Sequence, residues 1–342
     1  MNRFFLLICA LALASACAQR PSLRYEVIDE EQRDGYNCSL IRYCPLGEDT
    51  VQAFLLVPDA ARRGRKAPGL VLLHDHGARF DIGKEKLVRP LPSAPEHIKL
   101  SARQWNETNF DGSWFGDSLA RRGYVVIVPD MLYWGSRSTP LCRKWSRMKF
   151  CGVEGDLKAV GKEVYEGQRA VYDSLQRKGV VWAEQTLRED EAAAALLGSL
   201  PCVDGSRIGA FGWSMGAHRC WMLTAFSPLV STGVALCWMT MKRTCREPLA
   251  ASDYSMLVPD LRDRYDFPDI ARPLAPKPFF FYNGASDKLF PYEASVEAFD
   301  RMRQIYSEAG AEGALVTEFF DGPHHCGLSV QRRIVEFLNS NL

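Results

Sequence analysis

Short runs of consecutive apolar residues recur along the chain and alternate with longer segments of helix-forming residues. Such runs, when turn residues bound them, are typical of strands buried on both faces of a parallel sheet. The strand candidates of this kind are residues 69–73, 124–130, 207–211, 278–282 and 314–320. Earlier strand candidates are residues 24–30, 36–44 and 51–57, and helix candidates are residues 113–122, about 164–200, 217–223 and 329–338. This alternation predicts an α/β fold, a doubly wound and mostly parallel sheet with helices on both faces.

The length of the chain fits one large domain. With 342 residues, 47% of them hydrophobic, the chain can bury a substantial core. We therefore expect a single domain over residues 19–342. Two stretches that follow predicted strands, residues 80–112 and 131–156, are predicted insertions. Since loops on a rigid scaffold often set specificity, we expect both of them beside the functional site.

The first 18 residues have the features of a signal peptide. A basic start at residues 1–3 precedes the almost wholly apolar residues 4–13, and the small residues 14–16 fit the rule for cleavage. Cys17 comes next, as in bacterial lipoprotein signals, so a lipid anchor at Cys17 and release as a free protein are both open. We expect an exported protein, either periplasmic, secreted or an outer-membrane lipoprotein. No run approaches the roughly 20 apolar residues that a transmembrane span needs.

The charges argue against nucleic acid as a partner. The chain has 42 Lys and Arg against 41 Asp and Glu, a net charge of +1, and no basic footprint. Near the start of the first predicted insertion, Arg79, Lys84 and Lys86 are expected in salt bridges at the surface. Contact with an acidic group of the substrate is the alternative for these three side chains.

The chain has 11 cysteines, more than a cytosolic hydrolase usually keeps. In an oxidising compartment such cysteines can form disulfides. The pairs suggested by spacing are Cys38 with Cys44, Cys142 with Cys151, and Cys237 with Cys245. Buried free thiols are the alternative.

The sequence Gly-Trp-Ser-Met-Gly at residues 212–216 directly follows the apolar run 207–211 and precedes the helix candidate 217–223. A serine on a sharp strand-to-helix turn has little room around it, so glycine two positions before and after it lets the backbone close. This pattern predicts a nucleophile elbow with Ser214 as the nucleophile. The alternative is a turn serine that happens to be flanked by glycines.

A serine nucleophile needs a base and a carboxylate that orients the base. The loop after residues 278–282 contains Asp287, our candidate acid, and the loop after residues 314–320 contains two adjacent histidines. We expect His324 to be the base, with His325 as the alternative. The only other histidine after Ser214 lies one turn into the helix candidate.

Two backbone N–H groups should stabilise the oxyanion of a tetrahedral intermediate. One is that of Met215, and the second is expected in the loop after residues 69–73, with Ala78 as the candidate and Gly77 and Arg79 as alternatives. The same loop holds His74 and His76, an H-x-H spacing known from metal sites. No nearby Cys or His completes a ligand set, so no metal is expected, and we expect His74 to brace the loop by hydrogen bonds.

With these motifs the chain resembles the α/β-hydrolase superfamily, in particular the dienelactone hydrolases and acetyl xylan esterase-like proteins. Residues 322–328 match the terminal loop G-x-H-x-x-G-L of that branch, which favours His324 as the base, and the His-Gly at residues 76–77 is similar to its oxyanion loop. The resemblance implies the α/β-hydrolase fold and a serine-dependent carboxylic ester hydrolase that needs no cofactor.

The resemblance also implies a substrate class. Export and similarity to acetyl xylan esterase-like proteins favour removal of small acyl groups, such as acetyl, from a carbohydrate or a similar small ester. Two alternatives are kept: a serine peptidase of the prolyl oligopeptidase type, and a non-catalytic binding protein with the hydrolase fold.

Overall fold

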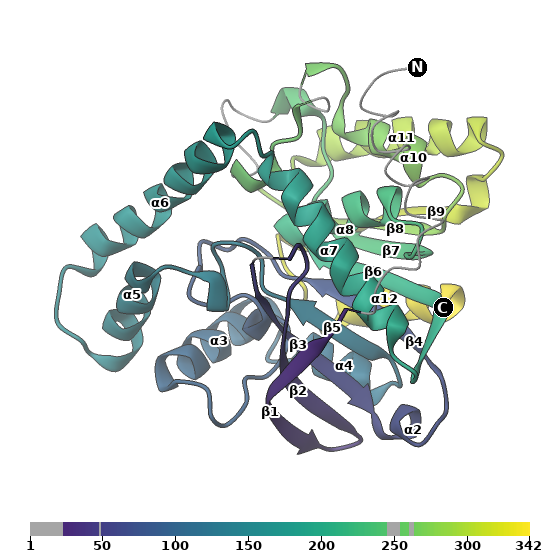
Figure 1. Ribbon diagram of the computed structural model, residues 1–342. Helices are drawn as coiled ribbons and strands as arrows, with labels where there is room; N and C mark the ends of the chain where they lie inside the picture. The colour runs from purple at the N-terminus through teal and green to yellow at the C-terminus, as the bar shows by residue number, and fades with distance from the viewer. Residues whose placement is uncertain (1–22, 48, 245–253, 260–262) are drawn as a thin grey trace.

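The computed structural model describes residues 23–47, 49–244, 254–259 and 263–342. Within them, the chain folds around a nine-stranded sheet (Figure 1) with the order β1-β2-β3-β5-β4-β6-β7-β8-β9. The strands are β1 (Tyr25–Arg33), β2 (Tyr36–Tyr43), β3 (Val51–Pro58), β4 (Ala67–Leu73), β5 (Val125–Pro129), β6 (Val203–Trp213), β7 (Thr232–Leu236), β8 (Phe279–Gly284) and β9 (Leu315–Phe320). The first three strands pair antiparallel and β3 pairs antiparallel with β5, whereas all later pairs are parallel. The predicted signal peptide, with Cys17, lies outside the described residues.

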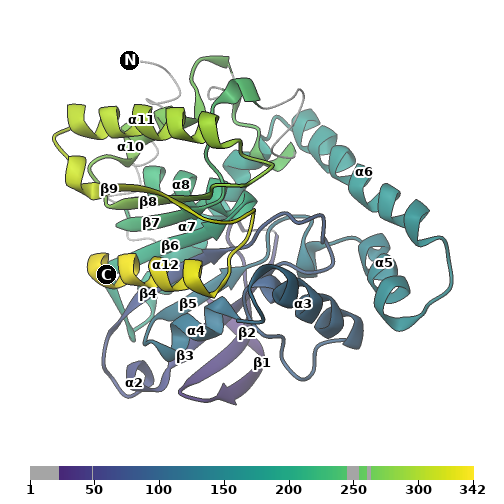
Figure 2. The same cartoon turned by 180° about the vertical axis from the view of Figure 1, so that it is seen from behind.

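Helices cover both faces of the sheet. Their bounds are α2 (Asp59–Arg62), α3 (Glu96–Asn109), α4 (Phe115–Arg121), α5 (Pro140–Cys151), α6 (Leu157–Arg177), α7 (Trp182–Ser199), α8 (Met215–Phe226), α10 (Ala271–Leu274), α11 (Tyr292–Glu308) and α12 (Leu328–Asn341). Short 3-10 turns are η1 (Lys84–Lys86), η2 (Gly135–Arg137), η3 (Lys242–Thr244), η4 (Tyr254–Met256), η5 (Phe267–Ile270) and η6 (Glu312–Ala314). Helices α7 and α8 lie on the face seen in Figure 1, and α4 and α12 lie on the face seen in Figure 2.

The strands alternate their side chains between two hydrophobic cores. In β5, Val125 and Ile127 belong to the core beneath α7 and α8, whereas Val126 and Val128 belong to the core beneath α4 and α12. All four side chains are fully buried. Because successive side chains of a strand point to opposite faces, the continuous apolar runs of the sequence are explained by burial on both sides. The predicted fold class is confirmed.

Several elements differ from the predictions, among them helices α3, α5 and α11, which were not predicted. Residues 164–200 do not form one helix: α6 ends at Arg177 and α7 begins at Trp182, with Gly179 in the left-handed region at φ 70° between them. Strand β7 was not predicted, because its five residues Thr-Gly-Val-Ala-Leu are short and include a glycine, which weakens the strand signal.

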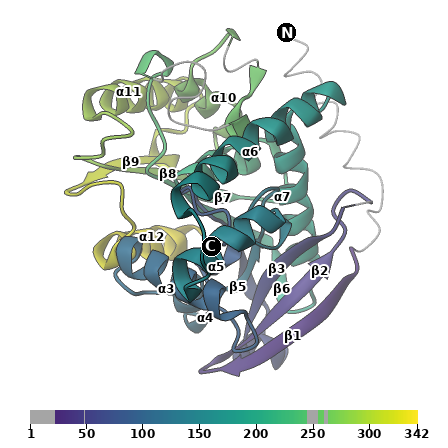
Figure 3. The ribbon, with the colours of Figure 1, turned by 90° about the vertical axis from the view of Figure 1, so that its left-hand side faces the viewer.

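The two predicted insertions supply helices on one side of the sheet. Residues 80–112 contain η1 and α3, and residues 131–156 contain η2 and α5. Helix α5 packs against both α3 and α6, and Figure 3 looks onto this group of helices. The loop after β4 reaches all three helices: Arg79 lies beside Trp105 of α3 and Trp145 of α5, and His76 contacts Gln168 of α6. The carboxyl ends of the parallel strands therefore face α3, α5 and α6.

Two predicted disulfides are wrong, because Cys38, Cys44, Cys142 and Cys151 are free. Cys38 lies in strand β2, and Cys44 follows the end of this strand, six residues later. At about 3.3 Å per residue, their Cα atoms are roughly 20 Å apart. Cys142 and Cys151 both lie on α5, roughly 13 Å apart at about 1.5 Å per residue. Disulfides require Cα atoms within about 7 Å of each other. The third predicted pair is also wrong, because Cys237 is free; its expected partner Cys245 lies outside the described residues.

None of the helices in the described part of the chain combines the length and the apolar character that crossing a bilayer requires.

Candidate active site

Ser214 lies on a sharp turn between β6 and α8. Its backbone has φ 56° and ψ −123°, a conformation that L-residues rarely adopt. The turn is tight, since a Cβ atom on Gly212 would lie 1.8 Å from the backbone oxygen of Gly216. The Ser214 side chain is partly exposed, while both of its neighbours in the sequence are buried. The local structure is thus the strand–turn–helix frame expected of a nucleophile elbow, and the role of Ser214 stays a prediction.

Replacing Gly216 with alanine is expected to destabilise the fold. The new Cβ atom would lie 1.9 Å from the backbone oxygen of Leu73, which no side-chain rotation can relieve. We expect a loss of unfolding free energy on the order of 3 kcal/mol or more, measured by urea denaturation. Gly313→Ala is the matched control, because a Cβ atom there has no atom within 4 Å. Equal stability of the two variants would contradict the tight packing of the elbow against β4.

Asp287 and His324 form a hydrogen-bonded pair at the carboxyl ends of β8 and β9. The Nδ1 atom of His324 lies 2.7 Å from Oδ2 of Asp287. The other carboxylate oxygen, Oδ1, accepts the backbone N–H of Leu289 at 2.8 Å and that of Phe290 at 3.4 Å. The Asp287 side chain is fully buried, and that of His324 is 20% exposed. The carboxylate is thus held in place and can orient the imidazole, leaving Nε2 of His324 as the ring nitrogen that can accept a proton.

The imidazole of His324 lies close to the elbow. Its ring centroid is 5.3 Å from that of Trp213, the residue before Ser214, and 5.9 Å from that of Phe290. Among the described residues the Ser214 hydroxyl and His324 share no hydrogen bond. Contacts between a nucleophile and its base are often long without substrate and tighten in the complex.

His325 faces a different partner. Its Nε2 atom lies 3.3 Å from Oδ1 of Asp111, at the end of the first insertion. The two adjacent histidines therefore have separate carboxylates. Only His324 lies against a buried one, which favours His324 as the base.

The candidate oxyanion donors differ in their hydrogen bonds. The N–H of Met215 is at the first position of α8, where helices lack an internal acceptor. The N–H of Ala78, in contrast, donates to Nδ1 of His76 at 2.9 Å. For Ala78 to hold an oxyanion, this bond would have to open. Gly77, the alternative beside it, is exposed at φ 54°, and the part of the chain that the structure describes provides no acceptor for its N–H.

His74 and His76 have separate roles in this loop. His74 is fully buried; its Nδ1 lies 3.0 Å from the backbone oxygen of Asp75, and its Nε2 accepts the N–H of Met131 at 3.2 Å. Burial, with the nearby charges of Arg219 and Lys86, holds the pKa of His74 well below its usual 6.5. The neutral ring braces the loop, as predicted. His76 instead binds Gln168 of α6 through Nε2 at 3.1 Å, so the two rings do not share a ligand.

Lys86 holds the loop after β4, which contains candidate oxyanion donors, and the sequence did not indicate this role. The Nζ atom of Lys86 donates to the backbone oxygens of Asp75 and His76 at 2.7 and 2.8 Å, and lies 3.2 Å from Oδ2 of Asp75. The side chain is fully buried, and this burial lowers the pKa of Lys86. Because the carbonyl groups of Asp75 and His76 point to the ammonium, the N–H groups of the same peptide units, those of His76 and Gly77, point away from it.

The three cations near the first insertion are buried, which corrects the prediction of surface salt bridges. Arg79, Lys84 and Lys86 are only 7%, 2% and 0% exposed. The salt bridges themselves are present, since Lys84 binds Asp130 at 2.6 Å and Arg79 lies 3.5 Å from Asp81. The neighbouring apolar residues Ile82, Leu87 and Val88 are the sequence signal that could have indicated burial.

Aromatic side chains surround the loop after β4. Trp105 of α3 packs so closely on Gly77 that a Cβ atom on Gly77 would lie 2.3 Å from the indole ring. The Trp105 side chain is partly exposed. Tyr165 of α6 is 55% exposed and lies 6.2 Å from the ring of His76. Trp134 is fully buried and donates to the backbone oxygen of His76. Of these three rings, those of Trp105 and Tyr165 have surface exposed to solvent.

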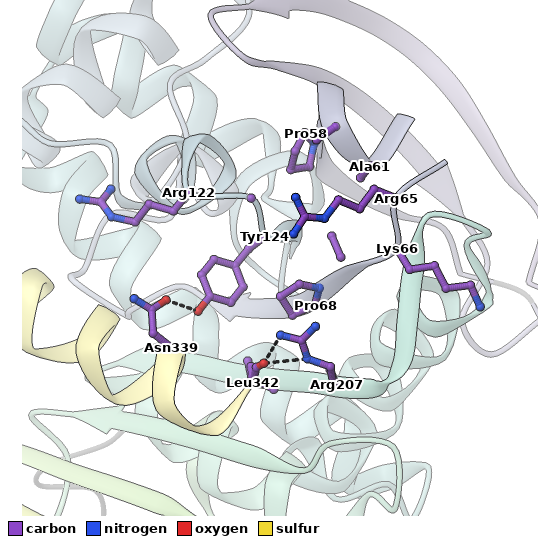
Figure 4. A pocket seen from close by; sticks show the side chains of 13 residues that line it. Pro58, Ala61, Arg65, Lys66, Pro68, Arg122, Tyr124, Arg207, Asn339 and Leu342 are labelled. Atoms are coloured by element: carbon purple, nitrogen blue, oxygen red, sulfur yellow. Dashed lines mark hydrogen bonds between the residues drawn. The ribbon is translucent and has the colours of Figure 1, made fainter. Parts of the chain in front are cut away.

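A pocket of about 370 Å³ lies at the opposite edge of the sheet, where β4, β5 and β6 begin (Figure 4). Arg65, Lys66, Arg122 and Arg207 contribute its basic side chains. The guanidinium of Arg207 points to Leu342, whose main-chain oxygen accepts from Nε at 2.7 Å. The length of the strands therefore separates this pocket from Ser214.

The sheet, the elbow and the loops that follow β8 and β9 define an α/β-hydrolase fold. The model of the dienelactone hydrolase family matches residues 109–243, a stretch that includes Ser214 and ends before Asp287 and His324. The central part of the chain is therefore similar to the dienelactone hydrolases, in agreement with the resemblance seen in the sequence.

Known proteins show the same likeness. The chain is 21% identical to the provisionally named hydrolase YtaP of Bacillus subtilis over 78% of this chain and 75% of that protein. A provisionally named acetyl xylan esterase of Bacteroides fragilis has a similar fold, with a TM-score of 0.64, 19% identity, and coverage of 92% of this chain and 73% of the other. Acetyl xylan esterase 1 of Thermoanaerobacterium has a TM-score of 0.58 at 14% identity, with 99% and 94% covered.

Proposed function

We propose that this protein is a serine-dependent carboxylic ester hydrolase with Ser214 as nucleophile, His324 as base and Asp287 as the carboxylate that orients the base. The observation that carries the proposal is the pair formed by buried Asp287 and His324, with 2.7 Å between Oδ2 and Nδ1. The imidazole of this pair lies beside Trp213, the residue before Ser214. The three residues come from loops at the carboxyl ends of β6, β8 and β9, where ligands bind in such sheets.

The chemistry follows from these atoms. Nε2 of His324 takes the hydroxyl proton as Ser214 Oγ attacks the ester carbonyl carbon, and Asp287 stabilises the resulting imidazolium. The imidazolium then gives that proton to the departing alkoxide, and an acyl group remains on Ser214. Water, activated by the same imidazole, releases the acid and restores the serine. No step requires a metal ion.

The oxyanion of both tetrahedral intermediates needs two N–H donors. Met215 supplies one in this proposal. The loop after β4 supplies the second, either from Ala78 after its bond to His76 opens or from Gly77, whose N–H has no such bond to break. The ammonium of Lys86 beneath this loop adds a positive charge near the developing negative one.

For the substrate we propose small acyl groups, acetyl above all, on a carbohydrate or a similar small ester. The support is the likeness to proteins named acetyl xylan esterases and the exposed ring of Tyr165 beside partly exposed Trp105, since aromatic rings pack against sugar rings. The predicted signal peptide supports an exported protein, with a lipid anchor at Cys17 and release as a free protein as the two alternatives.

A chain-length series of nitrophenyl esters tests this function. We expect the mature protein to hydrolyse the acetyl ester most efficiently, judged by kcat/KM, and to keep its activity in EDTA. An acetyl preference would justify a screen of acetylated sugars. Preferred cleavage of peptide anilides over esters would support a peptidase instead, and absence of both activities and of fluorophosphonate labelling would support a binding protein.

A further inference from the structure

One group of side chains at the candidate active site contains a residue that ester hydrolysis does not use. Cys237 follows β7, and Asp287 and His324 follow β8 and β9, so three neighbouring parallel strands bring the three residues together. One ligand atom from each, a thiol sulfur, a carboxylate oxygen and an imidazole nitrogen, all lie within 4.8 Å of one another. Soft divalent cations such as Zn²⁺ and Cd²⁺ bind such donors.

The three donors are held in position before any cation arrives. Cys237 is a free, fully buried thiol with a left-handed backbone at φ 54°, and its N–H donates to the backbone oxygen of Tyr282 at 2.8 Å. Asp287 is fixed through Oδ1 by the N–H of Leu289. His324 keeps 20% of its side chain exposed, which gives access from solvent.

We propose that Cys237, Asp287 and His324 form a binding site for a soft divalent cation of the zinc or cadmium class, and that such a cation switches off the hydrolase. The inhibitory part rests on the proposed function. The cation is an inhibitor here and has no part in the ester hydrolysis.

The cation occupies the position of the proton between Nδ1 of His324 and Oδ2 of Asp287. Metal–nitrogen and metal–oxygen bonds of about 2.0–2.2 Å at a tetrahedral angle place these two atoms roughly 3.4 Å apart, compared with 2.7 Å in the hydrogen bond. Cation binding therefore requires the two side chains to separate by roughly 0.7 Å. The sulfur of Cys237 is the third ligand, and water from the exposed side of His324 completes a tetrahedral set.

The proton balance explains the inhibition. The Cys237 thiol releases its proton to solvent as sulfur binds the cation, and the imidazole proton moves from Nδ1 to Nε2. An imidazole that carries its proton on Nε2 has no lone pair there for the Ser214 proton. His324 therefore cannot act as the base while the cation is bound.

Cation binding is tested in a way that does not depend on activity. In the full mature chain with Ser214→Ala, and with the exposed Cys44 and Cys151 replaced by serine, Cd²⁺ is titrated while the ultraviolet thiolate-to-cadmium charge-transfer band is followed. We expect a saturable band that disappears with Cys237→Ser and persists with Cys220→Ser, a control at a buried cysteine of α8. Circular dichroism checks folding, and Cys237→Ala replaces any variant that fails this check. A band of equal size without the Cys237 thiol would overturn the site.

Inhibition is tested by fluorophosphonate labelling of Ser214 in the chain that retains this serine. Saturating Cd²⁺ should slow labelling by about 10²-fold or more, the usual contribution of a general base, and EDTA should restore the rate. Labelling of Cys237→Ser should not respond to Cd²⁺. A band that depends on Cys237 together with unslowed labelling would overturn the inhibitory role. If the metal-free protein neither labels nor turns over esters, the proposed function fails, whereas the charge-transfer band still decides the cation site.

Discussion

Ser214→Ala is expected to lower kcat for nitrophenyl acetate by on the order of 10⁶-fold, the size of loss seen when the nucleophile of a serine hydrolase is removed. The elbow geometry should survive, because alanine keeps the Cβ atom of residue 214 and only the partly exposed hydroxyl is lost. Steady-state kinetics and covalent labelling by a fluorophosphonate measure the effect. Labelling should disappear together with turnover.

The matched control for this substitution is Ser206→Ala. Ser206 lies on the same strand, β6, at its opposite end, where its hydroxyl binds Asp204 on an exposed part of the surface. Turnover by this variant should equal that of the unmodified protein. If Ser214→Ala kept its activity and its label, another nucleophile would have to be sought, and the proposed mechanism would be wrong.

The residues of the candidate site could be predicted because they follow strands with strong sequence signals. The runs before Ser214, Asp287 and His324 are apolar on both faces, so the sheet and the edge at which their loops meet follow from the alternation of the chain. The match to the G-x-H-x-x-G-L loop already favoured His324 over His325, and the structure adds that the ring of His324 faces Asp287. Which ring faces Asp287 depends on the backbone of a loop, where a shift of one residue exchanges the two.

Other features of the site could not be predicted, because they depend on contacts between distant segments. The N–H of Ala78 donates to His76, a bond within the loop that no motif indicates. The burial of Lys86 follows from its contact with two backbone oxygens of that loop, whereas a lysine in a sequence normally indicates exposure. The predictions of Cys38–Cys44 and Cys142–Cys151 failed because a short spacing in the sequence does not show that a strand or a helix holds the two cysteines apart.

Among these contacts, the hydrogen bond of Ala78 bears most on the mechanism. Two exposed residues of the loop after β4, Gly77 and Ala78, offer an N–H group. The N–H of Ala78 already donates to His76. His76 is in turn held by Gln168 of α6. Helix α6, which packs on the inserted helix α5, thus contacts the loop that is proposed to supply the second oxyanion donor.

His324→Ala is the second substitution with a very large expected effect, also on the order of 10⁶-fold in kcat, since a base and its nucleophile act as a unit. The loss should not add to that of Ser214→Ala: the double variant should be about as slow as either single one. Steady-state kinetics with nitrophenyl acetate on the two single variants and the double variant measure this.

His325→Ala distinguishes the two adjacent histidines. His325 pairs with the half-exposed Asp111, and an exposed ion pair is worth about 0–1 kcal/mol, so a small loss of stability and nearly unchanged kcat are expected. The opposite pattern, with activity lost in His325→Ala and kept in His324→Ala, would require the loop after β9 to rearrange so that His325 reaches Asp287. In that case the 2.7 Å contact between His324 and Asp287 would not represent the catalytic arrangement, and the cation site that shares these two residues would have to be reconsidered with it.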